Sequence, residues 1–546
     1  MKISFVLSGL LTVAAPGIAF AETRPPQLSA EQWREDLRTV KTQIESRHPN
    51  PYNHTPKEKL DAAFADLDQS IPSLLRNQII VRMMKIVAMV GDGHTRIDPR
   101  KDDDFRFASL PLKLYSFDDG LFIRAAEPAL ARLVGWRVDA IGGVAIGEAE
   151  HRVGELVSAD TDMGKRQLVP LYLEMPEILQ ALGLSDRHDR ARLTLSRGKQ
   201  KQTVIVTATE VNPSWPPDTD ISLITPKGWT DACRGTVPLY LKNPLDYHRL
   251  VDLPDRKALY AQLNWVANIG GDTLAQYSQR ILERAAETNP RAIILDLRLD
   301  QGGNGNLATS LVDALIKAED ADTKLFALTG RGTFSASQFI LNDLGRLTHA
   351  VFVGEPASSK PSSYGDAFRT ELPNSKIDVR TSIYWWQDGQ NFDPYTWIDV
   401  AAPLRFGDYA ACRDPALEAA LSYSVASPLD AMLFEAAKAG GLESARSAVR
   451  AYLSAPEHRY AHVKLLLPRA AELVLAKGHQ AEAMAVAEAV AEALPQTVDS
   501  WVVLAYVALK NGDSSRAAKG AERALALDPN NRTAHDLLEQ ASVKGP

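Results

Sequence analysis

The sequence predicts a multi-domain α/β protein with an all-α tail, and two patterns carry this prediction. Between residues 292 and 353, continuous apolar runs alternate with segments of helical periodicity, which is the pattern of successive β-α-β units in a parallel sheet. In the last 90 residues, landmarks recur 34 residues apart, which is typical of stacked helix pairs. A chain of 546 residues, 45% hydrophobic and 24% charged, is too long for one core, so several domains are expected.

The net charge of the chain limits which classes of molecule it can bind. A formal net charge of −7 and the lack of any Lys/Arg-rich run exclude a nucleic-acid-binding protein, because that function needs a dominant cationic surface. A peptide or another small molecule stays open as the substrate.

The N-terminus predicts export. Lys2, an apolar stretch from Ile3 to Ala15 and the triplet Ala19-Phe20-Ala21 follow one another in the order of a secretory signal peptide, so residues 1–21 are expected to be removed. The apolar run is shorter than the ~20 residues of a spanning helix, so we expect no stable membrane insertion but a soluble, periplasmic or secreted protein. Cys233 and Cys412 are the only cysteines, and an oxidising compartment permits a disulfide between them or two separate buried thiols.

Two domains are predicted ahead of the α/β core. Residues 22–105 have helical periodicity, with a capping-box signature at Ser29–Gln32, and a last helix that delivers His94 on a glycine-rich turn. Residues 106–210 alternate between apolar and polar residues in short runs, which predicts a mainly β module. Within it, the stretch from Trp136 to Gly143 resembles a strand and turn of a PDZ domain.

Residues 211–427 form the predicted α/β core, and three polar motifs follow the ends of its strands. Open α/β sheets place their sites at this edge. The first motif is a turn that contains Gly302 and Gly303, whose main-chain N–H groups could point at a developing oxyanion. The turn lacks the Gly-x-Gly-x-x-Gly spacing of a dinucleotide site.

The second and third motifs supply a nucleophile and a base. Ser335 precedes a predicted helix, where unpaired N–H groups favour an alkoxide and Ala336 N–H could bind the oxyanion; the alternative is that Ser335 only caps the helix. Lys360 follows the next strand, 25 residues beyond Ser335. A lysine acts as a base only when its pKa falls by roughly 3 units, and an ordinary solvated lysine is the alternative.

These motifs match a known family in order and spacing. The segment from Thr333 to Gln338 resembles the Ser-Ala-Ser-Glu motif of the C-terminal-processing (tail-specific) serine proteases, and Gly354 to Lys360 resembles their Gly-Glu-Pro-x-x-x-Lys motif. The segment from Asp296 to Gly303 resembles their Asp-Leu-Arg-x-Asn-x-Gly-Gly turn, with Asp300 in the place of Asn. The resemblance covers residues 28–421.

The resemblance implies a core of the ClpP/crotonase type and an endopeptidase that forms an acyl-enzyme. Ser335 would be the nucleophile and Lys360 its base, with Gly302 or Gly303 and Ala336 forming the oxyanion hole. No metal or organic cofactor is implied.

Other residues point to one branch of this family. The stretch from Gly91 to Thr95 resembles the tricorn-like proteases and interphotoreceptor retinoid-binding protein, which implies His94 as a second candidate base. Gly93 stands where that branch has an assisting serine, and Gln338 stands where the family has Glu. The retinoid-binding members imply the alternative function, a catalytically inactive protein that binds an apolar ligand or a peptide.

Residues 428–546 are predicted to be a tetratricopeptide-repeat domain. Three landmarks recur at an offset of 34 residues: Leu475 as Leu509, Ala483 as Ala517, and Pro495 as Pro529. Such repeats bind extended segments, so this domain is expected to dock a protein partner or a substrate. Trp501, Leu504 and Tyr506 are expected to lie mostly between the repeats, with one or two aromatic side chains left exposed.

Overall fold

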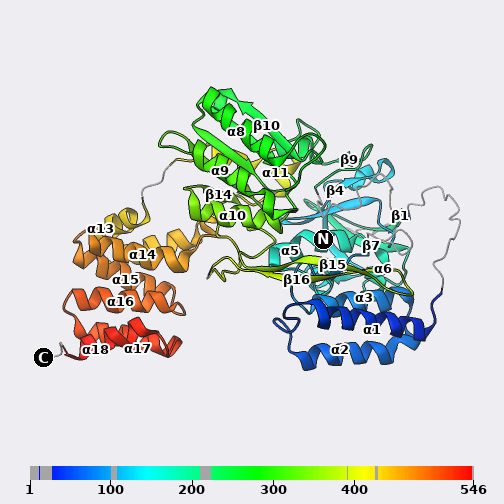
Figure 1. Ribbon diagram of the computed structural model, residues 1–546, viewed down its shortest axis with the longest axis horizontal. Helices are drawn as coiled ribbons and strands as arrows, with labels where there is room; N and C mark the ends of the chain where they lie inside the picture. Colours follow the sequence, from blue (N-terminus) through cyan, green and yellow to red (C-terminus); the bar gives the residue numbers. More distant parts are fainter. Residues whose placement is uncertain are drawn as a thin grey trace, which may run out of the picture. The chain divides into compact units, whose positions relative to one another are not determined.

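The computed structural model describes residues 11–12, 27–99, 107–209, 223–389, 391–424 and 428–543 (Figure 1). The chain forms two compact units: unit 1 comprises Met1–Thr396 and Ala402–Leu421, and unit 2 comprises Trp397–Ala401 and Ser422–Pro546. Of the predicted signal peptide only Leu11 and Thr12 are described, as strand β1 parallel to β8; the rest lies outside the described residues. Among the helices in these ranges, none is both long and apolar enough to cross a bilayer.

Unit 1 begins with three helices, α1 (Ala30–Arg47), α2 (Lys57–Ser70) and α3 (Arg76–Ala88). The Ser29 hydroxyl accepts the Gln32 N–H, which confirms the predicted capping box. The side chains predicted to form the apolar face of α1, among them Trp33 and Ile44, are buried. The chain then runs from α3 through the turn that carries His94 into the short strand β2 (Arg96–Ile97).

The next part of unit 1 is an antiparallel sheet with strand order β8-β7-β5-β4-β3. Its strands are β3 (Leu112–Phe117), β4 (Gly120–Ala126), β5 (Arg137–Ile141), β7 (Arg190–Arg197) and β8 (Gln200–Thr207). Its side chains pack into one hydrophobic core with those of α1–α3.

The prediction of a mainly β module missed three helices between β5 and β7. They are α4 (Ile146–Gly154), α5 (Asp162–Leu173) and α6 (Pro176–Ala181). The Thr161 hydroxyl caps α5 by accepting the Gly164 N–H, and every residue of α5 from Gln167 to Leu173 is buried. The sequence interpretation took the Asp and Gly residues of this stretch as turns, whereas here they begin a helix.

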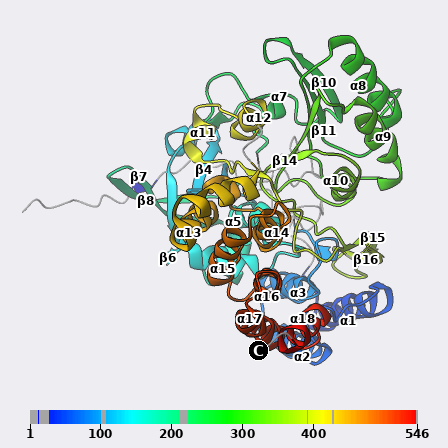
Figure 2. The same cartoon turned by 90° about the vertical axis from the view of Figure 1, so that its left-hand side faces the viewer.

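The α/β core contains the predicted parallel sheet. β11 (Ala258–Leu263), β12 (Ala292–Asp296), β13 (Lys324–Thr329) and β14 (Val351–Gly354) are parallel, and β10 (His248–Leu253) joins β11 antiparallel. Figure 2 shows α8 (Leu274–Thr288) and α9 (Thr309–Ala318) on one side of the sheet, and α11 (Phe406–Ala410) and α12 (Pro415–Leu421) on the other. The predicted strand-helix alternation from residue 292 to 353 is confirmed.

Two long-range links complete unit 1. The hairpin β15 (Ser363–Glu371) and β16 (Asp378–Trp386) pairs with β2 to form a three-stranded sheet. Cys233 and Cys412 form a disulfide, so the first of the two alternatives for the cysteines holds. The hairpin connects the α/β core to the segment that follows His94.

Unit 2 is all-α. It contains α13 (Leu429–Ser454), α14 (Val463–Ala476), α15 (Gln480–Ala493), α16 (Val498–Lys510), α17 (Ser514–Leu527) and α18 (Arg532–Val543). Small buried side chains such as Ala483 and Ala517 lie between neighbouring helices. On α16, Leu504 is buried and Tyr506 is exposed.

Candidate active site

Ser335 lies between β13 and α10 (Ala336–Leu347), in a backbone conformation that L-residues rarely adopt, with φ 58° and ψ −124°. Its N–H donates to the Ser359 hydroxyl at 2.9 Å, which ties the loop after β13 to the loop after β14. Because such a conformation costs free energy and persists only where neighbours hold it, it marks Ser335 as a candidate functional residue rather than an ordinary helix cap.

His94 contacts this serine directly. His94 Nε2 lies 2.9 Å from Ser335 Oγ. The imidazole stacks on the Phe334 ring, with 4.5 Å between the ring centroids, and its backbone N–H donates to Asp92 Oδ1 at 2.8 Å. His94 Nδ1 is buried and has no hydrogen-bond partner of regular geometry among the described residues. The nearby backbone of Tyr364 nevertheless acts to raise the pKa of His94.

The surroundings keep His94 neutral at physiological pH. Burial lowers the pKa of His94 to about 4; Arg96 and Arg380 act in the same direction, and the Asp92 carboxylate opposes them. A neutral imidazole has a free lone pair, so Nε2 can accept the Ser335 proton.

Asp92 fixes the turn that carries His94. Burial disfavours its charge, but the hydrogen bonds from His48 and from the Ser382 hydroxyl outweigh this and lower the pKa of Asp92 to about 2. The His48 Nδ1 accepts the Asn50 N–H, so Nε2 carries the proton that is donated to Asp92 Oδ2 at 3.0 Å. Asp92 is therefore an ionised carboxylate that holds the backbone of His94 in place.

The glycine turn after β12 approaches Ser335 closely. A Cβ on Gly302 would lie 2.7 Å from Ser335 Cβ, and a Cβ on Gly303 would lie 2.3 Å from the Val266 carbonyl oxygen, so both positions need glycine. The Gly302 N–H donates to Asp300 Oδ1 at 2.9 Å and is thus engaged. Gly303 and Ala336, the first residue of α10, line a hollow together with Ser335, so their N–H groups are the candidates for binding an oxyanion.

Asp300 is a fully buried carboxyl behind this turn. Its Oδ2 has no hydrogen-bond partner among the described residues, and burial raises the pKa of Asp300 to about 8. Near neutral pH the carboxyl is mostly protonated and resembles, in charge and shape, the asparagine of the family motif. Its backbone carbonyl accepts the Phe334 N–H at 3.0 Å, which links the turn to the serine loop.

The third predicted catalytic residue, Lys360, has a charge that acts on the buried carboxyl of Asp160. Lys360 is exposed, and it lines neither of the two hollows that meet at Ser335. Gln338 is buried, and its amide donates to Asn342 Oδ1 and Thr396 Oγ1. The structure thus brings His94, Gly303 and Ala336 to Ser335, with Gly302 directly behind, and leaves Lys360 at the surface.

Sequence reasoning missed Asp160, a buried residue that precedes α5. Its Oδ1 accepts the Gly93 N–H at 2.9 Å, and its side chain also interacts with Ser359. Burial, followed by the charge of Asp92, raises the pKa of Asp160 to about 7. Asp160 therefore contacts both the His94 turn and the residue that binds the Ser335 N–H. No motif surrounds it in the sequence, so only its packing reveals it.

Two hollows meet at Ser335 and His94. The larger, of about 700 Å³, is lined by Arg96, Arg369 and Arg380 together with Leu168, Trp265 and other side chains. The smaller, of about 470 Å³, is lined by Gly303 and by the aromatic rings of Phe339, Tyr364 and Trp386. A peptide could thus extend to both sides of the serine, as an endopeptidase substrate must.

Comparison with solved structures places this geometry in a known fold. A serine-to-alanine mutant of CPAF superposes with a TM-score of 0.51 at 10% identity, over 73% of this chain and 99% of that chain. The chain contains the tail-specific protease fold. The photosystem II D1 C-terminal processing protease matches over 72% of this chain and 99% of that chain, with 14% identity and a TM-score of 0.34.

The tricorn protease also matches, with 13% identity, a TM-score of 0.32, and coverage of 73% of this chain and 37% of that chain. Neither a protein-family model nor a curated protein sequence matches the chain. The tail-specific protease fold is therefore recognised from structure, at identities too low to transfer activity.

Proposed function

We propose that the protein is a serine endopeptidase in which His94 is the general base for Ser335. The observation that carries this proposal is the 2.9 Å separation of His94 Nε2 and Ser335 Oγ, with the imidazole kept neutral by burial. A nucleophile within hydrogen-bond reach of a neutral base is the arrangement that acyl transfer requires. Lys360, exposed and outside both hollows, has no part in this mechanism.

The residues act in sequence on a bound peptide. His94 Nε2 takes the Ser335 proton as Oγ attacks the scissile carbonyl carbon, and the carbonyl oxygen becomes an oxyanion between the N–H groups of Gly303 and Ala336. His94 then gives the proton to the leaving amine, and the acyl-enzyme remains on Ser335 Oγ. A water molecule, deprotonated by His94, hydrolyses the ester and regenerates the serine.

A fluorophosphonate probe tests this proposal directly. Wild-type protein should be labelled on Ser335, and Ser335→Ala should not be labelled. His94→Ala should slow labelling by about 10²–10⁴-fold, whereas Lys360→Met should label at the wild-type rate. Folded protein that never reacts would favour the alternative, a binding protein on this fold that holds a peptide or an apolar ligand.

We also propose that the protein is exported and that unit 2 docks a protein partner or a substrate. The disulfide between Cys233 and Cys412 supports export, because disulfides persist in oxidising compartments. The helix pairs of unit 2 and the exposed ring of Tyr506 support docking. Periplasmic fractionation with a thiol-labelling assay tests the first proposal. Tyr506→Ala should weaken capture of a partner and leave the turnover of a short peptide unchanged.

A further inference from the structure

Three arginines cross the sheet formed by β15, β16 and β2 in a single row. Arg369 pairs with Arg380 in the β15-β16 register, and Arg380 pairs with Arg96 in the β16-β2 register. Directly opposite residues of antiparallel strands lie on the same face of a sheet, so the three side chains share one face. We call this set the arginine row. All three members line the larger hollow beside Ser335.

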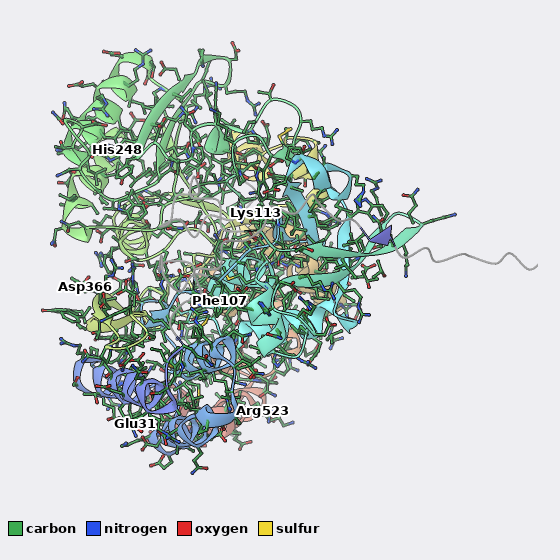
Figure 3. All side chains as sticks on the ribbon, turned by 90° about the vertical axis from the view of Figure 1, so that its right-hand side faces the viewer. Glu31, Phe107, Lys113, His248, Asp366 and Arg523 are labelled. Carbon is green, nitrogen blue, oxygen red and sulfur yellow. A yellow bond between two sulfur atoms is a disulfide. The ribbon has the colours of Figure 1, made fainter. Side chains whose placement is uncertain are left out.

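The row makes this hollow cationic. Two more charged residues line it: Arg331, which is buried and paired with Glu355, and Asp366, which Figure 3 marks on the hairpin. Arg369 also pairs with Asp378, and Arg96 and Arg380 have interactions of their own within the protein. A guanidinium carries five N–H donors, so one internal partner does not exhaust it.

Like charges placed directly opposite one another destabilise a sheet. A row of three arginines is therefore unfavourable for the stability of the hairpin, which suggests that it serves a function. The row lies close to the candidate catalytic pair. The charges of Arg96 and Arg380 act on His94 and help to lower its pKa.

The strand geometry gives the distance from the row to the reacting bond. Gly365 lies beside His94, since a Cβ at Gly365 would be 3.8 Å from His94 Cε1. Arg369 is four residues beyond Gly365 in β15, and a strand rises about 3.3 Å per residue, so Arg369 lies at most roughly 13 Å along the strand from Gly365. Arg96 is only two residues beyond His94 in the chain.

We propose that the arginine row binds a carboxylate of the peptide substrate, two to four residues from the scissile bond. An extended peptide advances by the same ~3.3 Å per residue as the strand, so a carboxylate at this spacing reaches the row. Arginine binds carboxylates through paired N–H groups, which adds orientation to charge. The proposal rests on Ser335 as the nucleophile only for the place of the scissile bond; carboxylate binding is independent of catalysis.

Binding to the Ser335→Ala protein tests the row without any turnover. Fluorescent decapeptides of one sequence carry a single Glu or a single Gln at each position from two to four residues on either side of the centre. Anisotropy should show about tenfold tighter binding of at least one Glu peptide over its Gln counterpart, falling steeply with added salt. A further pair ends at the same positions, with either a free α-carboxylate or an amide, and distinguishes a chain terminus from an acidic side chain.

The preference should depend on the row and not on charge in general. Arg369→Gln and Arg380→Gln should each reduce the Glu-over-Gln ratio to within about twofold of unity, and Arg380→Glu should favour a Lys peptide. Arg187→Gln is the matched control, because Arg187 is an exposed arginine of the β module that pairs with Asp189 and does not line the hollow.

Equal binding of the Glu and Gln peptides, or an equal loss for both in the row variants, would overturn the carboxylate site. If the preference is present but the wild-type protein neither cleaves these peptides nor reacts with a fluorophosphonate, the site stands and the endopeptidase proposal fails. If the protein cleaves Glu and Gln peptides with the same kcat/KM and binds them equally, only the arginine row proposal fails.

Discussion

The Phe334 ring occupies the space that a side chain on residue 93 would fill. A Cβ at Gly93 would lie 2.8 Å from Phe334 Cε2 and 2.9 Å from Cζ. The same ring stacks on the His94 imidazole. The glycine and the aromatic residue are therefore matched, and together they hold the imidazole beside Ser335.

This match predicts that Gly93→Ser impairs the proposed peptidase activity, although the substitution restores the residue type of tricorn-like proteases. The new side chain must displace Phe334 and tilt His94, so kcat/KM should fall by roughly 10–100-fold. Adding Phe334→Ala should recover part of the loss by making room. Gly147→Ser, at an exposed glycine with open space around it, is the control. Higher activity in Gly93→Ser would show that the packing argument is wrong.

The low pKa of His94 predicts that kcat/KM falls only at unusually acid pH. With a pKa of about 4 in the folded protein, the imidazole stays neutral well below the ordinary histidine range, so kcat/KM should hold from pH 7 down to about pH 5. Below pH 4 protonation removes the base, and activity should drop about tenfold per pH unit. A pH profile of peptide hydrolysis measures this, with Lys360→Met expected to share the curve. A midpoint near 6.5 would mean that His94 is hydrated in solution.

The raised pKa of Asp300 predicts that activity falls at alkaline pH. Ionisation above about pH 8 places a negative charge behind the Gly302–Gly303 turn, where it opposes a developing oxyanion, so activity should decline from about pH 8 upward. Asp300→Asn keeps an oxygen acceptor for the Gly302 N–H and cannot ionise. The variant should therefore lose this decline while keeping most of its activity at pH 7. An unchanged decline would assign it to another group.

The same residue links stability to pH. The pKa of Asp300 is raised in the folded state, from 3.8 to about 8, so its contribution is fully present below pH 3.8 and is lost as the pH rises through about 8. Wild-type Tm should therefore fall between pH 6 and pH 9 more steeply than the Tm of Asp300→Asn. The comparison between the two proteins removes the contributions of Asp160 and Glu177, whose pKa values burial also raises.

The disulfide predicts a redox-dependent stability. Cys233 and Cys412 are 179 residues apart in the chain, so the link removes much freedom from the unfolded state. Replacing both with serine should lower the free energy of unfolding of unit 1 by about 2–5 kcal/mol in a denaturant titration. Reduced wild-type protein should behave like the double variant. If oxidised and reduced protein unfold at the same denaturant concentration, the link does not stabilise the fold.

The core and the position of Ser335 after the end of β13 were predictable because they depend on local patterns. Buried strands such as β12 consist of continuous apolar residues, and the turn at Gly302 and the position of Ser335 follow directly from the strand ends. Spacing along the chain was enough to place these residues at one edge of the sheet, where the structure has them.

The partner of Ser335 could not be chosen in the same way. His94 lies beside it in a fold in which β16 pairs with β2, for example Val379 with Ile97, and no local pattern encodes such a long-range register. The loop that ends at Lys360 follows the correct strand, yet the side chain points to solvent, which spacing alone does not reveal. Asp160 was missed for a similar reason, since its role arises from burial.

The separation of His94 and Ser335 also has a consequence for the cell that makes the protein. When His94 has emerged from the ribosome, the serine, 241 residues further on, has not yet been synthesised. A nascent chain that ends before Ser335 therefore carries one half of the reactive pair at most. The proposed activity therefore arises only after Ser335 has been synthesised and β16 has paired with β2, so the order of synthesis delays it.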